Sequence, residues 1–189
     1  EEGSTDTSEC LYLPEFFPNR NPQLNGLGFR TGADAGTDVP FTQLPSDATL
    51  EIPAGGAIRI LPLFSDDSVE SYPNFTIDFI SNDIEIEVDE EDLSVSFFTT
   101  EGKLGHTVTA ELTTKSLDTS YTALSVAEAL KRDEVDPSDI ACDQVAEHFP
   151  REAYLYVVGR DSRGGTAWTI AHVRSLLPED RSLWGSKFE

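Results

Sequence analysis

Carboxylates are the side chains of this protein whose types and spacing come closest to a recognisable chemistry. They form two clusters in segments typical of loops, Asp66 with Asp67, and Asp89 with Glu91 and Asp92. Calcium takes about six to eight oxygen ligands from carboxylates and carbonyls, and loops at one end of a β-structure can supply them. These residues are candidate calcium ligands. The interpretation we favour is a set of solvated acidic loops without a cofactor, which a chain so rich in Asp and Glu produces readily.

Histidine, serine and glycine form no motif of catalysis or nucleotide binding in this sequence. His106, His148 and His172 are far apart and lack the paired spacing of a zinc site. No G-x-S-x-G turn for a nucleophilic serine occurs, and no glycine-rich phosphate-binding loop follows a predicted strand. We therefore predict that the protein is not an enzyme.

The two cysteines, Cys10 and Cys142, also fit no zinc motif. In an oxidising compartment they could form one long-range disulfide bond that fixes the N-terminal segment. We predict this bond, and two free thiols are the alternative.

The charge of the chain restricts its partners. Its 35 acidic residues outnumber 13 basic ones and give a net charge of -22. Such a field repels nucleic acids and anionic membranes, and it favours cations, basic partners or plain solubility. No apolar run approaches the roughly 18 residues of a spanning helix, so we predict no transmembrane segment.

The first nine residues, from Glu1 to Glu9, are small, polar and acidic. They are typical of a tether after a removed signal peptide, and they resemble the segment that follows the lipidated cysteine of bacterial lipoproteins. We expect a secreted or cell-surface protein, with a lipid-anchored outer-membrane or periplasmic protein as the more specific form. An ordinary chain boundary is the alternative.

A β-hairpin is the clearest structural element and spans residues 152–173. Two runs rich in aromatic and β-branched residues flank a polar turn, and Gly164-Gly165 supplies the positive φ that a reversal needs. The turn from Asp161 to Ala167, D-S-R-G-G-T-A, resembles the closing hairpin of bacterial immunoglobulin-like, cadherin-like and PKD-like domains. The turn Pro53-Ala54-Gly55-Gly56 between two apolar strands is similar to the opening of such domains. The resemblance implies an immunoglobulin-like antiparallel β-sandwich.

Short alternating segments between residues 47 and 173 agree with a mostly β fold. Strands are predicted at about 8–12 residue intervals, among them 74–80, 84–88, 93–98 and 107–112, and Ile84, Ile86 and Val88 are expected to point inward. Residues 1–46 are predicted as a tether and an irregular extension that packs on this core. Residues 174–189 are predicted as a C-terminal tail that packs loosely or docks elsewhere.

Residues 124–149 interrupt the strand pattern before the final hairpin. Ser125 and Glu128 have the spacing of a capping box, which predicts a short helix through Arg132. Asp136-Pro137 predicts the start of a second helix that ends before Pro150. The fold class is thus a β-sandwich with an irregular extension and a short helical insertion before its last hairpin.

The hairpin is apolar on both faces. Alternation places Ala153, Leu155 and Val157 inward, and it places outward a set of aromatic and apolar side chains: Tyr154, Tyr156, Val158, Trp168, Ile170 and His172. A strand face that meets water is normally polar, so something is expected to cover this one. The cover is either the protein's own extension or helices, or a partner. We predict Tyr154, Tyr156, Trp168, Ile170 and His172 as the binding residues.

These features predict a non-catalytic, secreted cell-surface binding or structural module. Adhesion, a surface layer, or a filament or assembly subunit are the roles that fit, with a protein partner or self-assembly. The alternative is a carbohydrate-binding or accessory domain of a secreted enzyme system that uses the aromatic rings to contact a glycan.

Overall fold

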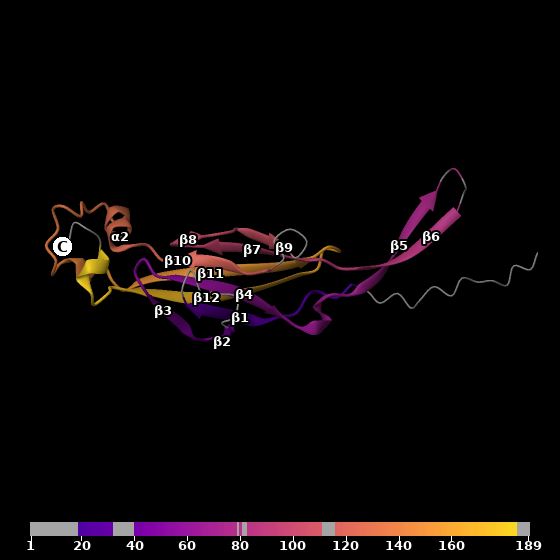
Figure 1. Cartoon of the computed structure of the whole chain (residues 1–189), viewed down its shortest axis with the longest axis horizontal. Coiled ribbons are helices and arrows are strands. Elements are labelled where there is room, and N and C mark those ends of the chain that lie inside the picture. The colour runs from indigo at the N-terminus through magenta and orange to yellow at the C-terminus, as the bar shows by residue number, and fades with distance from the viewer. Residues whose placement is uncertain (1–18, 32–39, 79, 81–82, 111–115, 185–189) are drawn as a thin grey trace, which may run out of the picture.

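The protein is mostly β, with two sheets that pack on one shared core. The computed structural model describes residues 19–31, 40–78, 80, 83–110 and 116–184. Within these residues there are two five-stranded sheets and a separate two-stranded sheet, together with one short α-helix. This arrangement is consistent with the predicted β-sandwich. The molecule is elongated, with the helical insertion at one end and the two-stranded sheet at the other (Figure 1).

The first sheet is antiparallel and has the order β2-β1-β4-β10-β8. Its strands are β1 (Leu24–Thr31), β2 (Thr42–Leu44), β4 (Ala57–Phe64), β8 (Lys103–Leu104) and β10 (Thr119–Thr122). The second sheet has the order β3-β12-β11-β7-β9, and only its β3–β12 pair is parallel. Its strands are β3 (Thr49–Pro53), β7 (Leu93–Thr99), β9 (Val108–Ala110), β11 (Arg151–Asp161) and β12 (Thr166–Leu176).

The core lies between the two sheets and is built by strict alternation along the strands. Ile58 and Ile60 of the first sheet and Phe97, Leu155 and Val157 of the second are almost fully buried in one cluster. Complete burial of such a side chain stabilises the fold by about 1.5–3 kcal/mol. The inward positions predicted for the hairpin, Ala153, Leu155 and Val157, are confirmed.

The β11–β12 hairpin is confirmed, and its turn is held by one carboxylate. Asp161 accepts hydrogen bonds from the backbone N–H groups of Arg163, at 2.9 Å, and Gly165, at 2.7 Å. Gly164 has a φ of 97°, a left-handed conformation that favours glycine. Asp161 and Gly164 therefore stabilise the conformation of the turn.

The N-terminal extension is more regular than predicted. β1 lies inside the first sheet, between β2 and β4, and the Asn25-Gly26 pair that predicted a turn lies within this strand. The β1–β4 register shifts between Leu24 and Gly26, and Gly26 has a φ of 138°. Glycine at positive φ serves a β-bulge as well as a turn, and the local sequence does not distinguish the two.

The helical insertion is partly as predicted. Helix α2 (Val126–Arg132) begins with the predicted capping box, in which Ser125 accepts from the Glu128 N–H and the Glu128 carboxylate accepts from the Ser125 N–H. The second helix is not formed, since residues 136–149 contain turns and only the 3₁₀-helix η2 (Val145–His148). The Asp136 carboxylate accepts from the Ser138 N–H at 2.8 Å, as an N-cap does, but the backbone bond that follows is that of a turn, from the Asp139 N–H to the Asp136 carbonyl at 3.0 Å.

A second, smaller apolar cluster closes the end of the molecule that carries α2. Val126 and Leu130 of α2 pack there with Val145 of η2 and with Trp184 of the 3₁₀-helix η3 (Arg181–Trp184). Trp184 is buried and donates a hydrogen bond from Nε1 to the Pro178 carbonyl at 2.8 Å. The segment predicted as a C-terminal tail thus completes β12 and then docks on the insertion.

The strands β5 (Ser71–Asp78) and β6 (Asp83–Glu90) form an arm that projects from the sandwich (Figure 1). The 3₁₀-helix η1 (Asp66–Ser68) precedes it. The sequence predicts these strands within the sandwich with Val88 inward, but Val88 is 69% exposed, so that expectation is wrong. Alternation determines which residues share a face of a strand, whereas it does not determine what that face packs against.

Candidate binding face

The outer face of the second sheet carries a continuous row of apolar side chains, which we call the aromatic face. Backbone register places Phe98 of β7 opposite Tyr156 of β11, and Tyr156 opposite Ile170 of β12. The neighbouring positions on this face add three more side chains, Tyr154, Trp168 and Val108. Side chains that the sequence separates by more than 70 positions therefore share one surface.

These side chains are exposed. Trp168 is 68% exposed, Phe98 55% and Tyr154 45%, and Ile170 and Tyr156 are 40% and 38% exposed. The insertion at 124–149 packs with Ala54 and Trp184 at the end of the sandwich, so the expectation that its helices cover the aromatic face is wrong. Of the N-terminal extension predicted as a cover, residues 1–18 and 32–39 lie outside the described residues. Within the described chain, this face meets solvent as a broad apolar surface.

The sequence predicts five of the residues at this face and misses two. Phe98 and Val108 lie on β7 and β9 and complete the apolar surface. Phe97 and Phe98 are consecutive in an alternating strand, which requires one of them to point outward. The sequence therefore indicates that one of these two rings points outward. It does not indicate that Phe98 pairs with Tyr156, because that pairing depends on the order of strands in the sheet.

His172 lies at one side of the aromatic face, and its ring is fixed on three sides. It stacks on Tyr154 with 5.1 Å between ring centroids and 16° between the planes. Its Nδ1 lies 2.9 Å from Thr49 Oγ1, and its Nε2 lies 2.5 Å from the Glu152 carboxylate. The His172 ring is therefore less exposed than its neighbours, and its stacking contact restricts the Tyr154 ring.

A charged row borders the aromatic face beyond His172. Register places Glu152, Arg174 and Glu51 side by side on β11, β12 and β3. Arg174 donates to Glu152 at 2.8 Å and lies 3.4 Å from Glu51. The hydrogen bond from Arg174 lowers the pKa of Glu152, and the hydrogen bond to Glu152 raises the pKa of Arg174. The face thus passes from exposed rings to paired charges within two rows of residues.

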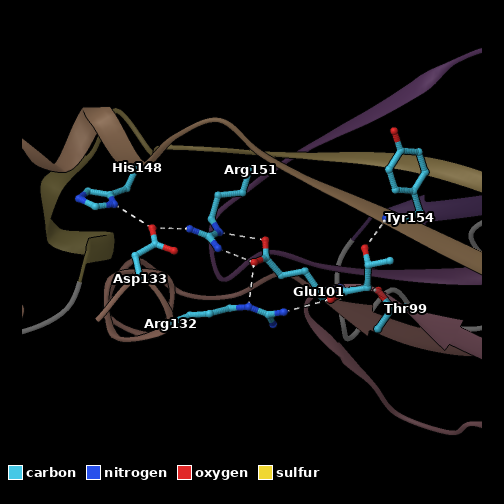
Figure 2. A network of polar contacts seen from close by, with 8 residues as sticks. Thr99, Glu101, Arg132, Asp133, His148, Arg151 and Tyr154 are labelled. Atoms are coloured by element: carbon cyan, nitrogen blue, oxygen red, sulfur yellow. Dashed lines mark hydrogen bonds and ion pairs between the residues drawn. The ribbon is translucent and has the colours of Figure 1, made fainter. Parts of the chain in front are cut away.

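A polar network joins this end of the sheet to the helical insertion (Figure 2). Arg151 donates to both oxygens of the Glu101 carboxylate, at 2.9 and 2.5 Å, and also donates to Asp133 at 2.7 Å. Arg132 approaches Glu101 at 3.5 Å, and His148 Nδ1 lies 2.8 Å from the Asp133 carboxylate. The network ties the end of α2, η2 and the start of β11 to the turn after β7.

Two members of the network, Asp133 and Arg151, have pKa values shifted in favour of their charged forms. Burial alone would raise the pKa of Asp133, but hydrogen bonds from Arg151 and His148 outweigh it and lower that pKa. The hydrogen bonds to Glu101 raise the pKa of Arg151, against the smaller opposing effect of its burial. A bidentate, poorly exposed Arg–carboxylate pair is among the stronger ion pairs in proteins, so the network fixes the insertion rather than leaving it loose.

The candidate calcium ligands are not brought together. Asp66 and Asp67 are exposed on η1, Asp89 accepts a hydrogen bond from Asn74 on the arm at 2.9 Å, and Asp92 is half-buried beside the hairpin turn. The described residues contain no group of three or more His, Cys, Asp or Glu side chains that could hold a metal ion. The calcium interpretation of these residues therefore has no geometric support among the described residues.

The fifth candidate ligand, Glu91, is already paired with the positively charged side chain of Arg163. Its side chain is fully buried, accepts a hydrogen bond from the Glu70 N–H at 3.2 Å and pairs with the Arg163 guanidinium at 3.2 Å. Arg163 also lies 3.9 Å from Glu70 and stacks over Tyr72 at 5.2 Å. An arginine of the hairpin turn therefore provides the positive charge at this acidic end of the sandwich.

The predicted disulfide involves a residue that lies outside the described residues, Cys10. Cys142 is half-buried and packs at the edge of the small cluster around Trp184. The Cys10–Cys142 bond stays a prediction.

Comparisons with protein-family models, with curated proteins and with solved structures found no significant match to this chain. Among the residues that the structure describes, none of the helices has the length and apolarity needed to cross a bilayer.

Proposed function

We propose that this protein is a non-catalytic binding module of a cell surface that contacts its partner through the aromatic face. The observation that carries the proposal is the exposed row Phe98–Tyr156–Ile170 with Trp168 beside it. Water-facing sheet surfaces are normally polar, and contiguous exposed apolar patches mark interaction sites. Trp and Tyr are also the side chains that most often dominate binding energy at interfaces.

We further propose an immunoglobulin-like identity for the sandwich, with secretion and a role in adhesion or assembly. The resemblance of the closing hairpin supports this, and so do the two packed sheets with β3 parallel to β12. The acidic surface, with its net charge of -22, suits a protein that must stay soluble at an exposed surface.

A protein surface is the partner that the chemistry of the aromatic face favours. Phe98, Val108 and Ile170 are purely apolar, and together with the rings they form a patch rather than separate ring platforms. The core of a protein interface is built in this way, with a polar rim around it. Glu152, Arg174 and Glu51 supply such a rim on one side, and the net charge favours a basic partner.

A glycan is the second candidate, and one observation favours it. Tyr154 is 45% exposed, it is held by the stacked His172 ring, and it lies directly beside the Glu152–Arg174 pair. A rigid ring next to charged hydrogen-bonding groups is an arrangement that can stack on a sugar and bind its hydroxyl groups.

Photocrosslinking from the aromatic face tests both candidates. The protein with a photoreactive phenylalanine analogue in place of Tyr156 would be incubated with intact cells and, in parallel, with an immobilised glycan array, and then irradiated. Trp168→Ser and Phe98→Ser should each lower the captured signal at least tenfold. Leu183→Ser is the matched control, because Leu183 is 62% exposed but lies on η3. Capture that survives both substitutions at the aromatic face would contradict the proposal.

A further inference from the structure

The second sheet ends on an open edge along the first half of β12. β3 pairs with His172–Leu176, whereas no strand within the described residues pairs with the edge side of residues 166–171. Natural sheet edges are usually protected by charge, proline or a bulge, and the sequence T-A-W-T-I-A contains no charged residue and no proline.

The backbone of this edge points its hydrogen-bonding groups outward. The Thr166 N–H donates to Asn21 Oδ1 at 3.1 Å and so faces away from β11. Farther along the same side, the Leu176 carbonyl accepts from the Ala54 N–H at 2.8 Å. Alternate residues of a strand present their N–H and C=O groups to the same side. Trp168 and Ile170 therefore offer theirs to an incoming strand.

A cavity of about 300 Å³ lies beside the open edge. Its walls come from β1, β2 and β12 and include Leu24, Leu27 and Leu44, with Thr169 and Ile170 across from them, and no charged residue lines it. The space suits a strand that places one apolar row against these leucines and an opposite polar row toward solvent.

The arm has the sequence pattern that such a position requires. The sequence of β6 alternates apolar residues, Ile84, Ile86 and Val88, with acidic ones. Val88 is 69% exposed, so this apolar residue faces solvent just as the neighbouring Glu87 does. A two-stranded hairpin alone is marginally stable in water, and a strand with one apolar row is typical of a sheet with one face on a core. The pattern fits the cavity better than it fits an isolated arm.

The arm and the open edge begin at the same end of the molecule. Arg163, three residues before Thr166, pairs with Glu91 at the base of the arm at 3.2 Å. From there the arm projects beyond the β11–β12 turn (Figure 1). A second copy related by a two-fold axis and meeting this end would lay its arm along the open edge while it receives the first copy's arm on its own edge.

We propose that two copies of this chain form such a reciprocal dimer, with β6 of each added to the β12 edge of the other. The interaction is strand addition, in which main-chain hydrogen bonds provide the contact and alternate side chains fill the cavity. Both copies carry a net charge of -22, so their repulsion opposes association at low salt. Added salt screens that repulsion, and the dimer is expected to strengthen as salt rises.

Analytical ultracentrifugation of the purified chain at low and high salt tests the proposal. The wild type should dimerise, and more tightly at high salt. Ile170→Pro removes an outward N–H without removing a bond to β11, and it should weaken the dimer at least tenfold, whereas Ile170→Ala, which keeps that N–H, should change it by less than about threefold. Val88→Asp on the arm should also weaken the dimer tenfold or more. Because Val88 lies outside the sandwich, this variant still tests the proposal if Ile170→Pro fails to fold.

A chain that stays monomeric at all salt and protein concentrations would overturn the proposal, as would a dimer that tolerates Val88→Asp. Phe98→Ser separates this site from the aromatic face, because Phe98 lies two strands away from the edge. It should leave the dimer unchanged while it lowers partner capture. A dimer lost in Phe98→Ser and kept in Val88→Asp would place the aromatic face, and not the edge, between the copies.

Discussion

Phe98 and Tyr156 lie directly opposite each other on β7 and β11, and both rings point to solvent, with 55% and 38% of their surfaces exposed. Their immediate sequence neighbours Phe97, Leu155 and Val157 are fully buried in the core. One strand pair thus separates two apolar surfaces, one that stabilises the fold and one that faces outward.

Substitutions on the buried surface should lower stability far more than substitutions on the exposed one. Leu155→Ala removes a fully buried side chain and should lower the free energy of unfolding by about 2–5 kcal/mol. Phe98→Ser should change it by less than about 1 kcal/mol, because the ring is exposed. Urea unfolding followed by circular dichroism measures both. Equal losses in the two variants would show that Phe98 is covered in the folded protein.

The Glu101–Arg151 pair should be needed to hold the helical insertion in place. Glu101→Gln leaves the poorly exposed Arg151 with only Asp133 as a charged partner, and the free energy of unfolding should fall by about 2–4 kcal/mol. Hydrogen exchange should show faster opening of α2 than of the β11–β12 hairpin. Lys103→Gln is the control, since the Lys103–Glu128 pair is far more exposed and should cost less than about 1 kcal/mol.

Acid should weaken the fold through Asp118. Its side chain is buried, and hydrogen bonds from Arg59 and Ser116 outweigh the opposing effect of burial and lower its pKa. A lowered pKa stabilises the fold above the unfolded value of about 3.9, and this stabilisation is lost as pH falls through the folded pKa. Asp118→Asn should therefore be less stable than the wild type near neutral pH, by about 1–3 kcal/mol, and the difference should narrow in acid. Unfolding curves at a series of pH values test this, and a constant difference would exclude the mechanism.

Alkali should weaken the fold through Tyr121. This ring is 1% exposed, and its burial, with a smaller effect of Glu101, raises its pKa to about 12 from an ordinary value of 10.0. The neutral ring is favoured in the folded state, so its contribution is complete below pH 10 and is lost as pH rises toward 12. Tyr121→Phe should remove that part of the alkaline loss of stability. The phenolate absorbance of the folded wild type should show one tyrosine that titrates late, and its absence would contradict the assignment.

Local patterns in the sequence predict a large part of this fold. The β11–β12 hairpin and the capping box at Ser125 depend on residues that are neighbours in the chain, and both are confirmed. The second helix is not formed although Asp136 accepts the N-cap hydrogen bond from the Ser138 N–H, so a capping signal alone does not determine a helix. β1 was missed because Gly26 at a bulge has the same signature as a turn.

Of the candidate site, the sequence predicts only the residues that belong to the β11–β12 hairpin. Tyr154, Tyr156, Trp168 and Ile170 share that hairpin, whereas Phe98 joins them through the pairing of β7 with β11, which no local pattern encodes. The projection of the arm and the pairing of Arg163 with Glu91 depend in the same way on contacts between segments distant in the chain. Whether the aromatic face is open or covered is likewise decided by tertiary structure.

Acrylamide quenching of Trp168 fluorescence in the free monomer tests the central claim most directly. The chain has two tryptophans, and Trp184 is 6% exposed while Trp168 is 68% exposed, so Trp184→Phe leaves Trp168 as the reporter. We predict quenching close to that of a tryptophan in an unfolded peptide, because the aromatic face is open and available to a partner. A Trp168 shielded from acrylamide in the folded monomer would contradict this account, because the chain would then cover its own binding face.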